Sequence, residues 1–121
     1  MDEAGHVAVL SSAGYGPIPE SVLTERVAVE HVVETLHALP PMTEAVRDTP
    51  PGEGDYSDWY ALSERGLFAY DWRFYEGPFL RLSCPREPIR VEALSDEARR
   101  VAQLVACPGE FRSSSTLTLP S

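Results

Sequence analysis

The sequence of 121 residues contains no lysine, and all ten of its basic residues are arginine. A GC-rich genome explains this bias most simply, and selection for bidentate arginine pairing is the alternative. The sequence also contains no apolar run long enough to cross a bilayer. Its first residues, Met1-Asp2-Glu3, are acidic where a secretory signal requires positive charge. We therefore expect a cytoplasmic protein that does not associate with membranes.

Cysteine is scarce, and its spacing points to no redox or metal site. Cys84 and Cys107 form no CxxC pair. In a reducing compartment such residues are small buried apolar groups more often than partners in a disulfide.

Motifs for catalysis or cofactor binding are missing as well. The glycines after Ser11 precede a helical pattern, but Pro19 occupies the place of the third glycine of GxGxxG. His31, Glu34 and His37 are three residues apart, and the second Glu-x-x-His of a carboxylate-bridged metal site is absent. A solvated helix face explains these three residues better. We expect no catalytic residue, no metal and no cofactor, and an enzyme is not favoured.

Charge is distributed unevenly along the chain. Residues 1–64 carry twelve acidic side chains and two arginines, a balance of −10, whereas residues 65–121 carry seven acidic side chains and eight arginines. With a balance of −10, the first half would not neutralise phosphates, which argues against non-specific nucleic-acid binding. An anionic membrane would repel the same half. The asymmetry favours a basic protein surface as the partner.

Composition and length predict a single α+β domain over residues 1–112, followed by a mobile polar tail over 113–121. Residues 6–10 suit a short strand. A long helix is expected from Pro19 or Glu20 to Leu39, where the Pro40-Pro41 pair would end it. A single helical turn is expected over 44–47.

The second half predicts an antiparallel meander, giving a sheet of three to five strands packed on the long helix and on a C-terminal helix. Strands are expected over 59–62, 67–75, 79–84 and 89–93. The clearest of these is 67–75, because Phe68, Tyr70, Trp72 and Phe74 share one face of the pleat, with Asp71 and Arg73 on the other. Ser95 has the character of an N-cap for a helix reaching residue 106. Thr116 to Leu119 alternates, and its pairing with an exposed sheet edge is the alternative to a mobile tail.

The strongest candidate site combines acidic and aromatic residues beside a Pro- and Gly-rich loop. Tyrosine and tryptophan anchor protein interfaces, and carboxylates steer a basic partner toward them. Packing of Trp59 into the core is an equally good explanation of its own position. The predicted partner-binding residues are Glu53, Asp55, Tyr56, Asp58, Trp59 and Tyr60.

These features together predict a non-enzymatic acidic protein that docks a basic protein partner, such as a bacterial immunity protein, antitoxin or secretion chaperone. One alternative is a small-molecule-binding domain or small enzyme. Its pocket would lie between the sheet and the long helix, near Tyr70, Trp72, His31 and Glu34. Another alternative is a structural or accessory subunit of a homo-oligomer, for instance a homodimer that covers an apolar patch.

Overall fold

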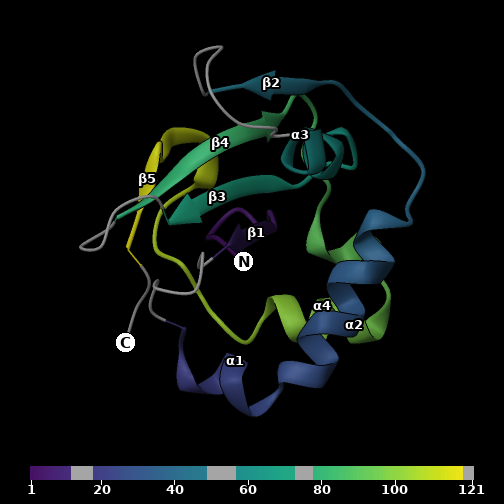
Figure 1. Ribbon diagram of the computed structural model, residues 1–121, viewed down its shortest axis with the longest axis vertical. Coiled ribbons are helices and arrows are strands. Elements are labelled where there is room, and N and C mark those ends of the chain that lie inside the picture. Colours follow the sequence, from purple (N-terminus) through teal and green to yellow (C-terminus); the bar gives the residue numbers. More distant parts are fainter. Residues whose placement is uncertain (12–17, 49–56, 73–77, 119–121) are drawn as a thin grey trace.

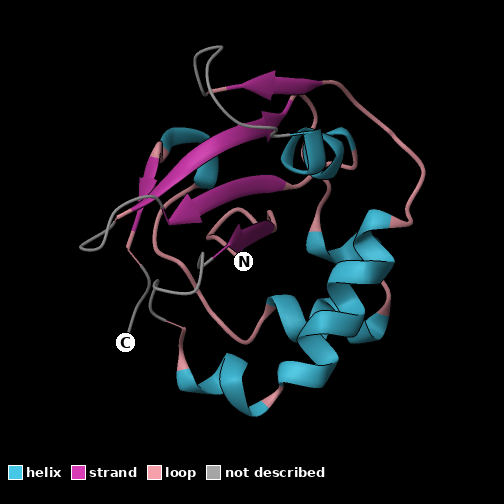
Figure 2. Cartoon of the chain, in the orientation of Figure 1, coloured by secondary structure: helices cyan, strands magenta, loops and turns pink. Residues whose placement is uncertain are grey.

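The computed structural model describes residues 1–11, 18–48, 57–72 and 78–118 (Figures 1 and 2). Over these residues the chain is an α+β fold. Its strands are β1 (Ala8–Ser11), β2 (Ala45–Arg47), β3 (Phe68–Trp72), β4 (Phe79–Pro85) and β5 (Thr116–Leu117). Its helices are α1 (Glu20–Thr24), α2 (Arg26–His37), α3 (Ser57–Glu64) and α4 (Asp96–Ala102), with two 3-10 turns, η1 (Val91–Ala93) and η2 (Phe111–Ser113).

The strands form one mixed sheet. Its order is β1-β3-β4-β2, and β5 pairs with the start of β4. The expected antiparallel pairing of β3 with β4 is confirmed, but β1 runs parallel to β3. The prediction of a purely antiparallel sheet is therefore wrong. Parallel neighbours need a long crossover connection, and the segment between β1 and β3, which contains α1, α2 and α3, supplies it.

The two faces of the central strands bury different kinds of residue. Phe68 and Tyr70 point into an aromatic cluster with Phe79, Phe111 and Leu117, and Trp72 packs against its margin. This confirms the predicted alternation as far as Trp72; Phe74 lies outside the described residues.

The opposite face is built from small residues, and α3 rests on it. Ala69 and Ser83 are paired across β3 and β4, and both are fully buried. The Ser63 and Ser83 hydroxyls lie 2.7 Å apart, and each also lies within hydrogen-bonding distance of a backbone carbonyl, so that one hydroxyl donates to the other and the other donates to its carbonyl. These small side chains let the helix approach the sheet closely while their polar atoms stay satisfied.

A second core lies where α2 and α4 meet the start of β1. The buried residues that form it come from six segments of the chain: Val7, Val32, Leu36, Leu62, Leu67, Val91, Leu94 and Ala98. Figure 2 shows the helices α1, α2 and α4 gathered on one side of the sheet, with α3 apart from them.

The long N-terminal helix is two helices. The break falls at Glu25, whose backbone (φ −106°, ψ 26°) is not helical. Just before it, the Thr24 hydroxyl donates to the Glu20 carbonyl at 2.9 Å, a local bond that competes with the helical ladder. The apolar residues of α2 recur at helical spacing on one stripe, of which Val32 and Leu36 are the buried members.

Two short segments adopt the opposite structure from the one predicted. Residues 59–62 belong to helix α3, not to a strand, and Ala45–Arg47 form strand β2, not a helical turn. Apolar runs of about four residues have no decisive period, so tertiary contacts decide between helix and strand. Here Leu62 and Ser63 face the core from α3, and Val46 pairs with Cys84 of β4.

The C-terminal region keeps its predicted helix but loses a strand. Residues 91–93 form the 3-10 turn η1, and the segment contributes only an isolated bridge between His6 and Arg90. The Ser95 cap is confirmed, since its hydroxyl accepts from the Ala98 amide at 3.2 Å, but α4 ends at Ala102. Thr116–Leu117 pair with β4, as the alternative interpretation of this segment expected.

Gly66 provides a test of how the fold constrains the turn before β3. Its φ is +88°, and a Cβ atom at this position would lie 2.7 Å from the Ile89 nitrogen. Gly109 is the matched control, because its φ of +78° is similar but nothing lies within 4 Å of a Cβ. We expect Gly66→Ala to cost about 2–4 kcal/mol in urea unfolding and Gly109→Ala about 1–2 kcal/mol. Equal losses would show that the Ile89 contact is unimportant.

Candidate functional site: an apolar cavity beside β1

A cavity of about 530 Å³ lies between β1, the helices α1 and α2, and the segment from α4 to Phe111. Pockets that bind small ligands have volumes on the order of 300–1,000 Å³. Arg26 and Glu30 are the only charged residues among those described that line it. The rest of the lining is apolar and includes Val9, Leu10, Val22, Val29, Val101 and Val105.

Helices α1 and α2 form one wall through the apolar stripe seen in the sequence. Val22, Val29 and Val33 line the cavity and are only partly buried, and α1 has no buried residue at all. The stripe is thus wider than the core it covers. Its outer members stay partly exposed at the cavity wall.

Strand β1 forms the opposite wall. All four of its residues are partly exposed, although three of them, Ala8, Val9 and Leu10, are apolar and sit within a sheet. Val7 and Val9 belong to the core near α2 and α4, whereas Ala8 and Leu10 pack against the aromatic cluster. Residues from both faces of β1 therefore line the cavity, which places it at the edge of the strand.

The third wall is held by the first residue of the chain. The Met1 amino group donates to the carbonyls of Ala102 and Val105 at 3.1 and 3.0 Å, and the Cys107 amide donates to the Met1 carbonyl at 2.8 Å. Burial lowers the pKa of the Met1 amine. Burial likewise raises the pKa of the Cys107 thiol, which keeps it protonated at neutral pH.

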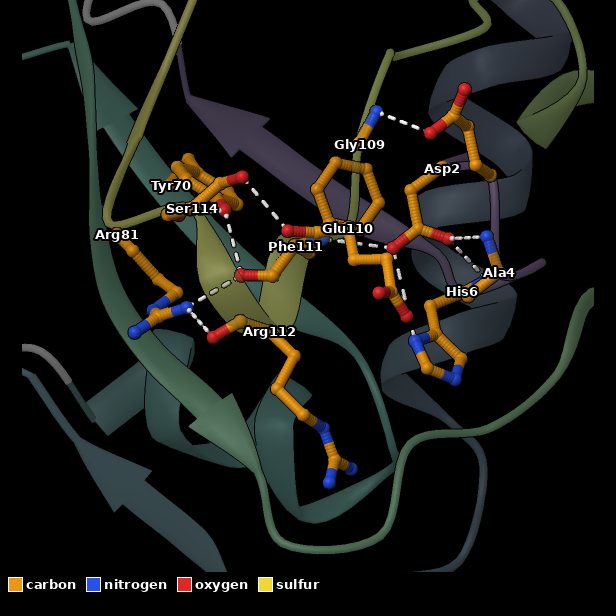
Figure 3. Close-up of polar contacts among 11 residues, drawn as sticks. Asp2, Ala4, His6, Tyr70, Arg81, Gly109, Glu110, Phe111, Arg112 and Ser114 are labelled. Carbon is orange, nitrogen blue, oxygen red and sulfur yellow. Dashed lines mark hydrogen bonds and ion pairs between the residues drawn. The ribbon is translucent and has the colours of Figure 1, made fainter.

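Asp2 fastens this wall to the rest of the fold (Figure 3). Its side chain is buried, and Oδ1 accepts from the amides of Ala4 and His6 at 3.0 and 2.9 Å. The other oxygen, Oδ2, accepts from the Phe111 amide at 2.8 Å. By accepting from these three amides, the Asp2 carboxylate ties the N-terminal residues to the segment around Phe111.

Tyr70 and Arg81 hold the same segment from the sheet (Figure 3). The Tyr70 hydroxyl donates to the Ser114 carbonyl, and Arg81 Nη1 donates to the carbonyls of Phe111 and Arg112. Arg81 also pairs with Asp48 at 2.8 Å. Phe111, which lines the cavity, is thus fixed from two sides.

The predicted partner-binding residues do not line the cavity. Asp58, Trp59 and Tyr60 occupy the first turns of α3, where Asp58 is exposed and the two aromatic residues are partly buried. The Arg47 guanidinium lies 4.5 Å from the Tyr60 ring centre, a cation–π distance. The other three predicted residues, Glu53, Asp55 and Tyr56, lie outside the described residues.

Ion pairs reduce the charge difference between the two halves of the chain. Three arginines of the second half contact carboxylates of the first: Arg81 with Asp48, Arg86 with Glu44 at 2.7 Å, and Arg100 with Glu25 at 3.4 Å. Exposed pairs of this kind contribute only about 0–1 kcal/mol each to stability. Their larger effect is to place positive charge beside the early carboxylates.

The residues expected around a small-molecule pocket are not those that line this one. Tyr70 is fully buried in the aromatic cluster, and His31 Nδ1 contacts Glu97 Oε1 at 2.5 Å on the surface. Neither they nor Trp72 and Glu34 are lining residues. The sequence signal for this wall is the run of valines at helical spacing over 22–33, a pattern that fits a core-facing helix equally well.

Among the described segments, no helix has the length and apolar character needed to cross a membrane. No family model matches the sequence, and no similar protein is found among curated proteins or among solved structures.

The buried Tyr70 hydroxyl, which donates to the Ser114 carbonyl, makes the stability of the folded protein depend on pH. Desolvation raises the pKa of its phenol above the usual value, so the neutral form stabilises the folded state. This stability is fully present below about pH 10 and decreases as the pH rises further. We expect Tyr70→Phe to cost about 1 kcal/mol at neutral pH, and the deficit to shrink at pH 11. Urea unfolding at both pH values measures it.

Tyr60→Phe is the control for that experiment, because Tyr60 lies at the surface of α3 beside Arg47. A deficit for Tyr70→Phe that is the same at both pH values would contradict the role given to the buried phenol.

Proposed function

We propose that this protein is a non-enzymatic binding protein whose cavity beside β1 holds an uncharged apolar group. The observation that carries the proposal is a cavity of about 530 Å³ in which apolar side chains on β1, α1 and α2 remain partly exposed. Each Å² of that surface removed from water by a ligand contributes roughly 25 cal/mol. A bound apolar group would cover these partly exposed side chains and remove them from water.

Charge supports an uncharged occupant. The two charged lining residues, Arg26 and Glu30, already pair with each other at 3.1 Å, and both side chains are largely exposed. An unpaired charge buried among the valines would carry a large desolvation cost. The net charge of −9 further disfavours an anion.

The chemistry of the lining supports binding more than catalysis. Cys107 is the one thiol among the described lining residues, and its raised pKa disfavours the nucleophilic thiolate. Arg26 and Glu30, at 77% and 63% side-chain exposure, are too open to water for strongly shifted acid–base chemistry.

Filling the cavity tests the proposal. Val29 lines it, whereas Val27, two residues away on α2, does not line it and is 82% exposed. We expect Val29→Trp to weaken binding of the neutral fluorescent probe N-phenyl-1-naphthylamine by at least about tenfold, a loss of about 1.4 kcal/mol. Val27→Trp should leave the affinity unchanged. Equal affinities of both variants and the original protein would contradict the proposed site.

Docking of a basic protein partner is the second candidate, and the overall charge of −9 favours it. The partner would meet Asp58 and the exposed parts of Trp59 and Tyr60 on α3. Steered association slows as salt screens the charges. We therefore expect capture of a basic partner at low salt to fall steeply with rising salt, and to weaken for Asp58→Asn together with Trp59→Ala. Salt-independent capture would argue against this candidate.

A further inference from the structure

The open edge of β1 faces the cavity. In the sheet order β1-β3-β4-β2, β1 is terminal, and within the described part of the chain it pairs only with β3. Figure 1 shows β2, β4, β3 and β1 in succession, with α1 and α4 beyond β1 on the side away from β3. The cavity therefore occupies the position where a further strand would lie.

The backbone groups that face this space follow from the pairing register. The Phe68 amide donates to the Val7 carbonyl at 3.0 Å, so Val7, Val9 and Ser11 direct their backbone groups toward β3. Those of Ala8 and Leu10 point the other way, because successive residues of a strand alternate. Neither residue makes a hydrogen bond to a described residue on that side.

An edge strand with unpaired N–H and C=O groups is a template for another strand. A purely hydrocarbon ligand would cover the valines but would leave these polar groups without partners, which is costly in a site that excludes water. An extended peptide satisfies both requirements, since its backbone pairs with β1 and its side chains fill the apolar walls.

The charges around the cavity specify what should flank such a peptide. Helices α1 and α2, with the residue between them, carry four carboxylates, Glu20, Glu25, Glu30 and Glu34, against one arginine, Arg26. Arg100 pairs with Glu25 and offsets one of them. The excess remains negative, so positive charge on the incoming segment is favoured.

We propose that the occupant of the cavity is an extended, apolar peptide segment flanked by basic residues, which adds to the sheet as a strand beside β1. The four residues of β1 span about 13 Å at roughly 3.3 Å per residue, enough to pair with a segment of about four residues. This inference rests on the proposed function, and it replaces a generic apolar group with a peptide of defined chemistry.

Ala8 allows the backbone pairing to be tested separately from the cavity. Proline lacks an N–H and is tolerated at edge positions where that N–H does not bond within the sheet. Ala8→Pro thus removes a donor that faces the cavity and leaves the bonds to β3 in place. Ala8→Val retains the donor and is the matched control.

The probe is the labelled peptide acetyl-RVTVTVR-amide, titrated by fluorescence anisotropy into the full chain. We expect binding to the original protein and to Ala8→Val, and an affinity at least about tenfold weaker for Ala8→Pro. The affinity of Ala8→Pro for N-phenyl-1-naphthylamine should stay within about twofold, because the dye uses no backbone pairing. Replacing the terminal arginines of the peptide with aspartates should weaken binding, with a difference that shrinks at high salt.

A second measurement does not depend on the folding of any variant. The same peptide, N-methylated at alternate residues to remove one row of donors, is titrated into the original protein in both registers. One register should lose binding by at least about tenfold and the other should not, because only one row of donors faces β1. Equal binding of both N-methylated peptides would overturn strand addition.

The outcomes separate this inference from the function on which it rests. If the dye binds and no peptide does, strand addition is wrong and the cavity holds a small molecule. If neither the dye nor a peptide binds, the proposed function fails as well.

Discussion

Three amides donate to the Asp2 carboxylate: those of Ala4 and His6 fix the first residues of the chain, and that of Phe111 links them to the segment that follows α4. The Met1 amino group and the Tyr70 and Arg81 side chains hold other parts of the same wall. The carboxylate is buried, and a buried charge is stable only when its lone pairs are filled, as the amides of Ala4, His6 and Phe111 fill them. The same residue thereby links the chain just before β1 to Phe111, which lines the cavity.

The cavity results from a mismatch between two amphipathic surfaces. The valine stripe of α1 and α2 is wider than the contact that the core offers, and β1 ends the sheet before the sheet reaches that stripe. The break at Glu25 turns α1 so that Val22 still faces the space. Native interiors are normally packed as densely as organic crystals. An apolar space of this size, beside a strand edge that pairs with no other described strand, therefore points to function more than to imperfect packing.

Much of the fold could be predicted from local signals, and the site could not. The alternation over Phe68 to Trp72 and the Ser95 cap are short-range patterns, and both hold in the structure. The parallel placement of β1 depends on a crossover through three helices, which no local pattern reports. The residues of α3 had no decisive period.

The sequence does not predict the cavity for a related reason. A valine that lines a pocket and a valine that fills a core have the same spacing in sequence. Val29 and Val32 lie on the same helix and both line the cavity, but Val29 stays partly exposed whereas Val32 is buried. The charge asymmetry along the sequence is likewise reduced in the folded chain, because Arg81, Arg86 and Arg100 contact carboxylates of the first half.

The parallel pairing of Ala8 with Phe68 has a consequence for how the molecule is made. Contacts between residues so distant in sequence form slowly, because a long loop must close before the pairing compensates its entropy. The hairpin of β3 and β4 is local and assembles without β1. Until β1 docks, the edge of β3 that contains Phe68, Ala69 and Tyr70 has no neighbouring strand on that side. During synthesis the partly formed sheet is therefore most prone to self-association through β3, the strand that lies between β1 and β4 in the folded protein.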